Sequence, residues 1–179
     1  MSSERLVIDS SPLNYFARSN QLPVLEKLLS GRSCLITKAV EEELLVGASK
    51  HPKLYQVSIQ PWITVAEEFT RDFYALLTMY HLRLGGGKRD IGEAMTLAYA
   101  EVHGITAMID DRSARKYGKS RGVKMTGTLE LLCQNIRKSM ISTENACEVI
   151  DLLAEHEAFL PCDGDTFIAW AQAEGLLDP

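Results

Sequence analysis

The chain has 179 residues, of which 46% are hydrophobic and 24% charged, and its formal net charge is −5. This length and composition indicate one well-buried globular domain and exclude a disordered chain. The acidic balance argues against a protein that coats nucleic acid electrostatically. It does not exclude a protein whose clustered acids bind divalent cations.

Features that would place the chain in a membrane or outside the cell are not seen in the sequence. No apolar run approaches about 18 residues, and the first five residues lack the basic and apolar regions of a signal peptide. We therefore expect a soluble, cytoplasmic protein. The four cysteines show no C-x-x-C spacing, which favours reduced thiols, and the four histidines form no pair at metal-ligand spacing, so zinc is not expected.

The first predicted element is a strand over Leu6-Val7-Ile8. Because these apolar residues follow one another without polar alternation, the strand is expected to be buried on both faces, as in a parallel sheet. A helix over 12–18 follows, with Ser10 or Ser11 as its cap. Asp9 would then stand at the carboxyl end of the strand, where open α/β sheets bind their ligands.

The rest of the chain alternates predicted strands and helices. Further strands are expected at 34–37, 61–65, 105–109 and 123–126. Helices are expected at 22–30, 39–46, 66–84, 90–103, 112–121, 127–139, 143–155 and 163–175. Residues 50–60 are expected to form a loop that could include an edge strand at 55–59. This alternation predicts a three-layer α/β/α sandwich with a central parallel sheet, formed by residues 1–160 with 161–179 as a C-terminal helical extension of the same domain.

Acidic residues recur where predicted strands end and where the neighbouring helices begin. They are Asp9, Glu41, Glu42, Glu43, Asp90, Glu93, Asp110 and Asp111. In a parallel sheet these positions lie on one edge, so the carboxylates are expected to converge and to raise one another's pKa values. A hard divalent cation relieves such repulsion, and oxygen ligands suit Mg²⁺ or Mn²⁺. A site of this kind can activate water and stabilise the departing oxygen of a phosphodiester.

Each acid also has a simpler interpretation. Asp90 and Glu93 fit a capping box, and Asp110 or Asp111 could cap the basic helix that follows. Glu41 and Glu42 could form an exposed helix face. Asp9 is hardest to interpret in this way, because a carboxylate directly after three buried residues is costly without a partner.

Basic residues cluster on the helix expected at 112–121. Arg112, Arg115, Lys116 and Lys119 stand at i, i+3, i+4 and i+7, which places them on one helical face. They form either a solvated face or a surface that holds an RNA backbone beside the acids. Lys88 and Arg89 have the same two interpretations, as part of a flexible loop or as RNA contacts.

Four segments together resemble the PIN-domain family: Ile8–Leu13, Ile36–Leu44, Asp90–Ala98 and Met108–Arg112. The D-x-G-E-A form at 90–94, with Thr126-Gly127-Thr128 downstream, is similar to a prokaryotic subgroup related to VapC toxins. The resemblance covers about residues 5 to 160. It departs from the common pattern after Ala94, where Met95-Thr96-Leu97 lacks the second acid that many relatives have.

The resemblance implies a Mg²⁺- or Mn²⁺-dependent endoribonuclease with a PIN-like fold. By position, Asp9, Glu43 and Glu93 match the first three acids of the family, and Asp110 or Asp111 matches the fourth. The resemblance assigns Asp90 to the subgroup's own motif, and we include it among the expected metal ligands. It further implies a toxin of a toxin–antitoxin pair, with an RNA substrate, a protein antitoxin and a homodimer as partners.

Two other functions remain open from the sequence. The first is a PIN-like module that binds RNA or a protein without cleaving, although retention of all the acids favours the enzyme. The second is a phosphatase that forms an aspartyl-phosphate. That chemistry usually shows D-x-D after the first strand, where this chain has Asp9-Ser10-Ser11.

Overall fold

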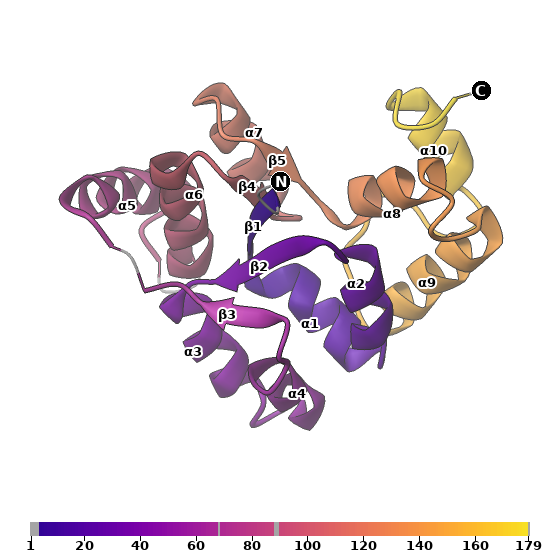
Figure 1. The fold of residues 1–179 in the computed structure, drawn as a ribbon, viewed down its shortest axis with the longest axis horizontal. Coiled ribbons are helices and arrows are strands. Elements are labelled where there is room, and N and C mark those ends of the chain that lie inside the picture. The colour runs from indigo at the N-terminus through magenta and orange to yellow at the C-terminus, as the bar shows by residue number, and fades with distance from the viewer. Residues whose placement is uncertain (1–3, 68, 88–89, 179) are drawn as a thin grey trace.

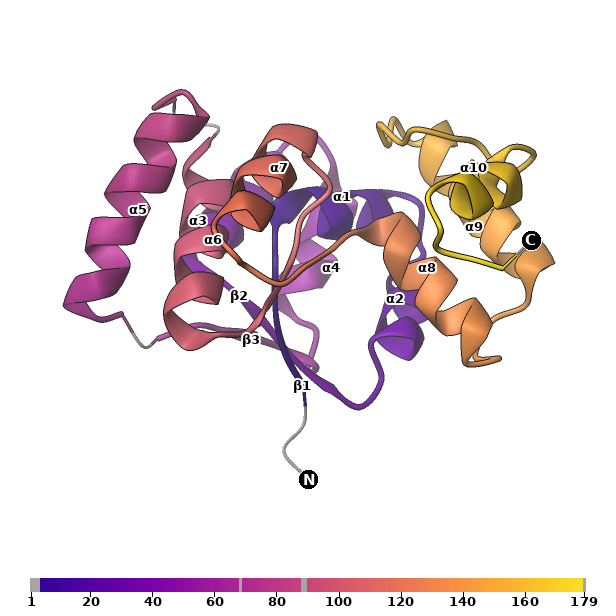
Figure 2. The ribbon, with the colours of Figure 1, turned by 90° about the horizontal axis from the view of Figure 1, so that it is seen from above.

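The computed structural model describes residues 4–67, 69–87 and 90–178. Among these residues, no helix combines the length and the apolar character needed to span a lipid bilayer. The helices α5 and α10 lie at opposite ends of the molecule, with the sheet between them (Figure 1 and Figure 2).

A five-stranded sheet forms the centre of the fold. Its strands are β1 (Glu4–Ile8), β2 (Arg32–Ile36), β3 (Ile63–Val65), β4 (Thr106–Met108) and β5 (Met125–Thr126). They are ordered β3-β2-β1-β4-β5, and every pair is parallel. With helices on both faces, this arrangement confirms the predicted α/β/α sandwich.

Helices cover both faces of the sheet. One side carries α1 (Ser10–Arg18), α2 (Leu22–Leu28), α3 (Lys38–Gly47), the 3₁₀ turn Pro52–Leu54, α4 (Tyr55–Ser58), α8 (Thr128–Arg137), α9 (Thr143–Glu155) and α10 (Phe167–Ala173). The other side carries α5 (Arg71–Leu84), α6 (Ile91–His103) and α7 (Arg112–Ser120).

The first strand divides the core in two because successive side chains point to opposite faces. Leu6 and Ile8 pack into the core under α1, α2 and α8, whereas Val7 packs into the core under α5 and α6. All three are at most 1% exposed, which confirms a strand buried on both faces.

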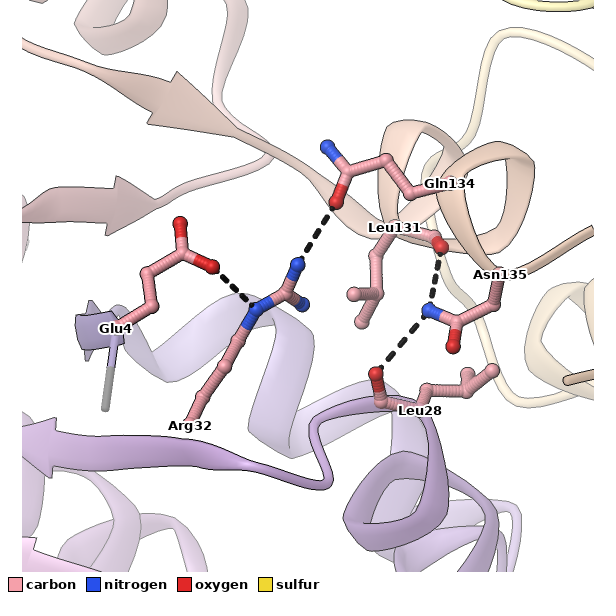
Figure 3. Close-up of polar contacts among 6 residues, drawn as sticks. All are labelled: Glu4, Leu28, Arg32, Leu131, Gln134 and Asn135. Carbon is pink, nitrogen blue, oxygen red and sulfur yellow. Dashed lines mark hydrogen bonds and ion pairs between the residues drawn. The ribbon is translucent and has the colours of Figure 1, made fainter. Parts of the chain in front are cut away.

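Polar contacts attach α8 to the first half of the chain (Figure 3). Arg32 on β2 donates to Glu4 on β1 at 2.9 Å and to Gln134 on α8 at 3.1 Å. The buried amide of Asn135 donates to the carbonyl of Leu28 at 3.1 Å. The side-chain groups of α8 therefore hold it against both β2 and the end of α2.

Three predicted elements differ clearly from the structure, the first being the helix expected at 163–175, which is the shorter α10. Where an edge strand could have formed at 55–59, residues 55–58 form helix α4, because Leu54 and Val57 are buried one helical turn apart. The helix predicted from residue 66 begins at Arg71, where the Thr70 side chain caps it by accepting from Phe73 N at 3.3 Å. A capping residue sets a helix start more firmly than the periodicity of the residues before it.

The strand order creates a switch point beside β1. The chain runs from β1 to β2 and β3 on one side and then returns to place β4 on the other side of β1. Asp9 N donates to Met108 O at 2.9 Å, so the carboxyl ends of β1 and β4 are adjacent. Crevices at such switch points are the usual ligand sites of open α/β sheets.

Candidate functional site

Asp9 occupies the switch point and is 1% exposed. Its Oδ2 accepts a hydrogen bond from Ser11 N at 3.3 Å and caps α1, so Asp9 itself takes the capping role expected of Ser10 or Ser11. Its Oδ1 is buried without a hydrogen-bond partner among the described residues. Burial, and then the charges of Glu43 and Asp110, raise the pKa of Asp9 to about 7.

Glu43 reaches the same site from α3, across the start of α6. A Cβ added at Gly92 would lie 2.8 Å from Glu43 Oε2 and 3.7 Å from Asp9 Oδ1. The two carboxylates therefore face one point on α6, and the glycine leaves the space that they use. Burial raises the pKa of Glu43, while a hydrogen bond with the Ser10 side chain acts in the opposite direction.

Glu93 lies next to Gly92 in the first turn of α6. Its pKa is raised to about 8, first by burial and then by the charges of Asp9, Asp111, Asp90 and Glu43. Residues far apart in the sequence thus act on one carboxyl group. This is the electrostatic signature expected of converging acids.

Asp110 and Asp111 follow β4 but have different surroundings. Asp110 accepts from Thr128 at both oxygens, from the amide at 2.7 Å and from the hydroxyl at 2.6 Å. Burial raises its pKa, and the Thr128 hydrogen bonds and the Arg115 charge oppose that rise. Asp111 is exposed and caps α7 through Ala114 N at 2.7 Å, so the capping interpretation holds for this residue.

The remaining predicted acids lie around this centre. The Asp90 side chain makes no capping hydrogen bond to α6 and instead accepts from Gly87 N at 3.0 Å, so a capping box with Glu93 is not formed. Glu41 pairs with Lys38 at 2.5 Å, and Glu42 and Glu43 are both exposed. Of the three consecutive glutamates, Glu43 is the one that reaches Asp9.

The four basic residues of α7 do not behave alike. Arg112, Lys116 and Lys119 are exposed, whereas Arg115 has 14% of its side chain exposed and points inward. Arg115 donates to Ile109 O at 2.9 Å and forms an ion pair with Glu130. Lys88 and Arg89 lie outside the described residues.

Three further residues of this site, Tyr15, Thr128 and Glu130, were not predicted from the sequence. Tyr15 lies on α1, and its pKa is raised by burial and then by the charge of Asp110. Thr128 and Glu130 belong to the first turn of α8, where the Thr126-Gly127-Thr128 segment leads into the helix. That segment was noted for its resemblance alone, and no spacing in the sequence connects Glu130 with Arg115.

The site combines donors suited to a hard cation. Asp9, Glu43, Glu93 and Asp110 supply carboxylate oxygens, one of which is buried and unpaired. Across residues 4–67, 69–87 and 90–178, however, no group of three or more histidine, cysteine, aspartate or glutamate side chains is arranged to hold a metal ion. The donor chemistry fits a divalent cation, although the side chains do not form a ready-made coordination shell.

Comparison with known proteins agrees with this architecture. A family model described as PIN domain matches residues 5–163, which include every acid of the site. A search of curated proteins gave no match. Because the match spans most of the sequence, from β1 to the segment after α9, the chain belongs to the PIN-domain family.

Proposed function

We propose that this protein is a metal-dependent endoribonuclease that hydrolyses RNA phosphodiester bonds. PIN domains are commonly nucleases that use divalent metal ions. The observation that carries the proposal is the buried, unpaired Oδ1 of Asp9, which faces Glu43 across Gly92 at the switch point of the sheet. An unpaired buried carboxylate oxygen is unfavourable on its own, so its presence there favours a ligand of opposite charge.

The residues proposed to hold Mg²⁺ or Mn²⁺ are Asp9, Glu43, Asp90, Glu93, Asp110 and Asp111. The described residues do not form a ready-made coordination shell, and a cation would draw these oxygens together by offsetting the repulsion between their ionised forms. When bound, such ions lower the pKa of a water molecule and stabilise the charge on a phosphodiester.

The protein's own groups have distinct parts in this proposal. Thr128 orients the Asp110 carboxylate by binding both oxygens. The α7 cap at Asp111 fixes the helix that presents Arg112, Lys116 and Lys119, whose charges attract the RNA backbone. Glu93, with a pKa of about 8, holds a proton on its carboxyl group near neutral pH and must release it to bind a cation.

A finer assignment follows from the segments noted in the sequence. We propose that the chain is a VapC-like toxin of a toxin–antitoxin pair, acting in the cytoplasm, with a protein antitoxin and a homodimer as its assemblies. The D-x-G-E-A form at 90–94 and the Thr126-Gly127-Thr128 segment support this assignment. Induced expression in bacteria should arrest growth for the wild type but not for Asp9→Asn.

Cleavage of a labelled RNA tests the activity directly. The wild type should cleave with Mn²⁺ and stop with EDTA, and Asp9→Asn should lose at least about a hundredfold in rate, because it removes the charge at the centre of the site. Asp72→Asn, an exposed acid on α5, serves as the matched control. Equal rates for wild type and Asp9→Asn would refute the hydrolase. RNA binding without cleavage would instead identify a non-cleaving module.

A further inference from the structure

An ion pair lies next to Asp110, on the two helices that follow it in the chain. Arg115 on α7 pairs with Glu130 on α8, and both side chains are mostly buried, with 14% and 23% of their surfaces exposed. Arg115 also donates to the carbonyl of Ile109, the residue before Asp110. The guanidinium is therefore fixed by two acceptors, neither of which is Asp110.

The three charged groups meet at Gly127. A Cβ there would lie 2.6 Å from Arg115 Nη1, 2.7 Å from Glu130 Oε2 and 2.8 Å from Asp110 Oδ1. Arg115 thus has two carboxylates within reach of its guanidinium and binds the one that is not part of the acidic site. Asp110 instead accepts from the Thr128 amide and hydroxyl, one at each oxygen, and each oxygen keeps lone-pair capacity for a cation.

We propose that Glu130 is a positioning residue that holds Arg115 away from Asp110, so that Asp110 stays free to bind a divalent cation. The proposal rests on the metal-dependent function proposed above. Without Glu130, the positive charge of Arg115 would be uncompensated, and its nearest carboxylate would be Asp110. An arginine paired with an aspartate favours the charged pair strongly enough to compete with a cation for the same oxygens.

This arrangement predicts an unusual pattern among variants. Glu130→Gln should weaken Mn²⁺ binding roughly tenfold, because Arg115 then turns to Asp110. Adding Arg115→Met to Glu130→Gln should restore most of the lost affinity, because the competing cation has been removed. A purely structural role would give the opposite result, since the second substitution would add damage to the first.

Isothermal titration calorimetry of the full chain with Mn²⁺ alone measures this pattern without RNA, and thermal unfolding confirms that each variant is folded. The matched control is Glu101→Gln, with and without Arg121→Met. In that pair 22% of the Glu101 side chain and 32% of the Arg121 side chain are exposed. It lies at the C-terminal end of α6 and just after α7, and its loss should leave Mn²⁺ affinity unchanged.

Each result decides between outcomes. Wild-type affinity in Glu130→Gln, or no recovery in the double variant, overturns the role of Glu130 and leaves the nuclease proposal intact. Absence of Mn²⁺ binding by the wild type overturns the metal-dependent function and this inference with it. If Glu130→Gln does not fold, Arg115→Met alone decides, because it should bind Mn²⁺ at least as tightly as the wild type and a tenfold loss refutes the proposal.

Discussion

Asp9 shows how a single residue can be unfavourable for the fold and useful for the site. Its carboxylate is buried, one oxygen has no partner among the described residues, and two other acids repel it. The unfolded chain exposes the same group to water, where it ionises freely. Folding therefore stabilises the protonated form, and stability becomes dependent on pH.

The sign of this dependence follows from the pKa of Asp9. The group loses its proton near pH 3.8 in its ordinary state and near pH 7 in the folded protein. Between these values the folded state binds more protons, so the free energy of unfolding falls as pH rises. Asp9→Asn removes the ionisable group and with it this fall in the free energy of unfolding. It should therefore stabilise the metal-free protein by about 2 kcal/mol at pH 8, with little effect at pH 4.

Urea unfolding in EDTA at both pH values measures the effect of Asp9→Asn. The low-pH measurement is the internal control, because Asp9 is then neutral in the folded wild type. An equal change at pH 4 and pH 8 would contradict the assigned ionisation of this residue.

A substitution at Gly92 should weaken cation binding without lowering the stability of the fold. Gly92→Ala places a methyl group 2.8 Å from Glu43 Oε2, and the flexible glutamate must swing away from Asp9. An alanine is favoured over glycine within a helix by up to about 1 kcal/mol. We therefore expect a folded protein of near-normal stability whose Mn²⁺ affinity is at least about fivefold weaker, measured by calorimetry.

Gly47→Ala is the matched control for Gly92→Ala. It also adds a methyl group to a helical glycine, but the nearest atom is Leu54 Cδ1 at 2.9 Å, in the apolar core. This variant should change stability and leave Mn²⁺ affinity as it is. Unchanged affinity in Gly92→Ala would show that Glu43 does not take part in binding.

At this scale the sequence predicted the acids better than their surroundings. Asp9 was identified because a carboxylate directly after three buried residues is costly unless the fold gives it a partner, and the structure places it at the end of β1. Glu130 could not be identified, because its partner Arg115 lies on another helix and sequence spacing carries no sign of the contact. Helical spacing placed Arg115 with the exposed cations, whereas packing turns it inward.

At the scale of an element, α7 carries positive charge on the surface beside the acids. Arg112, Lys116 and Lys119 are exposed and separated by about one helical turn. Their neutralisation by Arg112→Met, Lys116→Met and Lys119→Met should raise the KM for RNA about tenfold and leave kcat nearly unchanged, because backbone contacts position the substrate without touching the reacting bond. The salt dependence of RNA binding should also weaken.

Steady-state cleavage at several salt concentrations measures both effects. Neutralising Lys50 and Lys53, which precede α4, provides a control with two charges removed elsewhere. If the α7 variant changes kcat and not KM, the helix acts on the acids and not on the RNA.

Some helices and strands could be predicted from local sequence patterns, whereas others depend on tertiary contacts. Strands and helices with strong patterns, such as β1 and α9, were predicted closely because burial and a Ser142 cap agree. Helix α4 was missed because it is short and its fold depends on two buried residues packing against α1 and α3. Tertiary contact, which the local sequence does not show, decides such segments.

At the scale of the whole molecule, the parallel sheet brings the distant acids together. Alternation of strands and helices was enough to predict this fold, because short right-handed crossovers leave few other arrangements. The strand order was not predictable from that alternation, and it is this order that places the ends of β1 and β4 side by side. The site thus depends on a long-range property of the sheet.

Packing between α10 and the rest of the core decides whether residues 161–179 belong to the domain. Phe167 on α10 is fully buried in the core shared by α1, α8 and α9, while Phe159 in the preceding loop is 93% exposed. Phe167→Ala should therefore lower the free energy of unfolding by about 3 kcal/mol in a single transition, and Phe159→Ala by less than about 0.5 kcal/mol. Urea unfolding followed by tryptophan fluorescence and circular dichroism compares the two. Coincident transitions mean that residues 161–179 fold with the rest, whereas a separate early transition in Phe167→Ala would make them an independent unit.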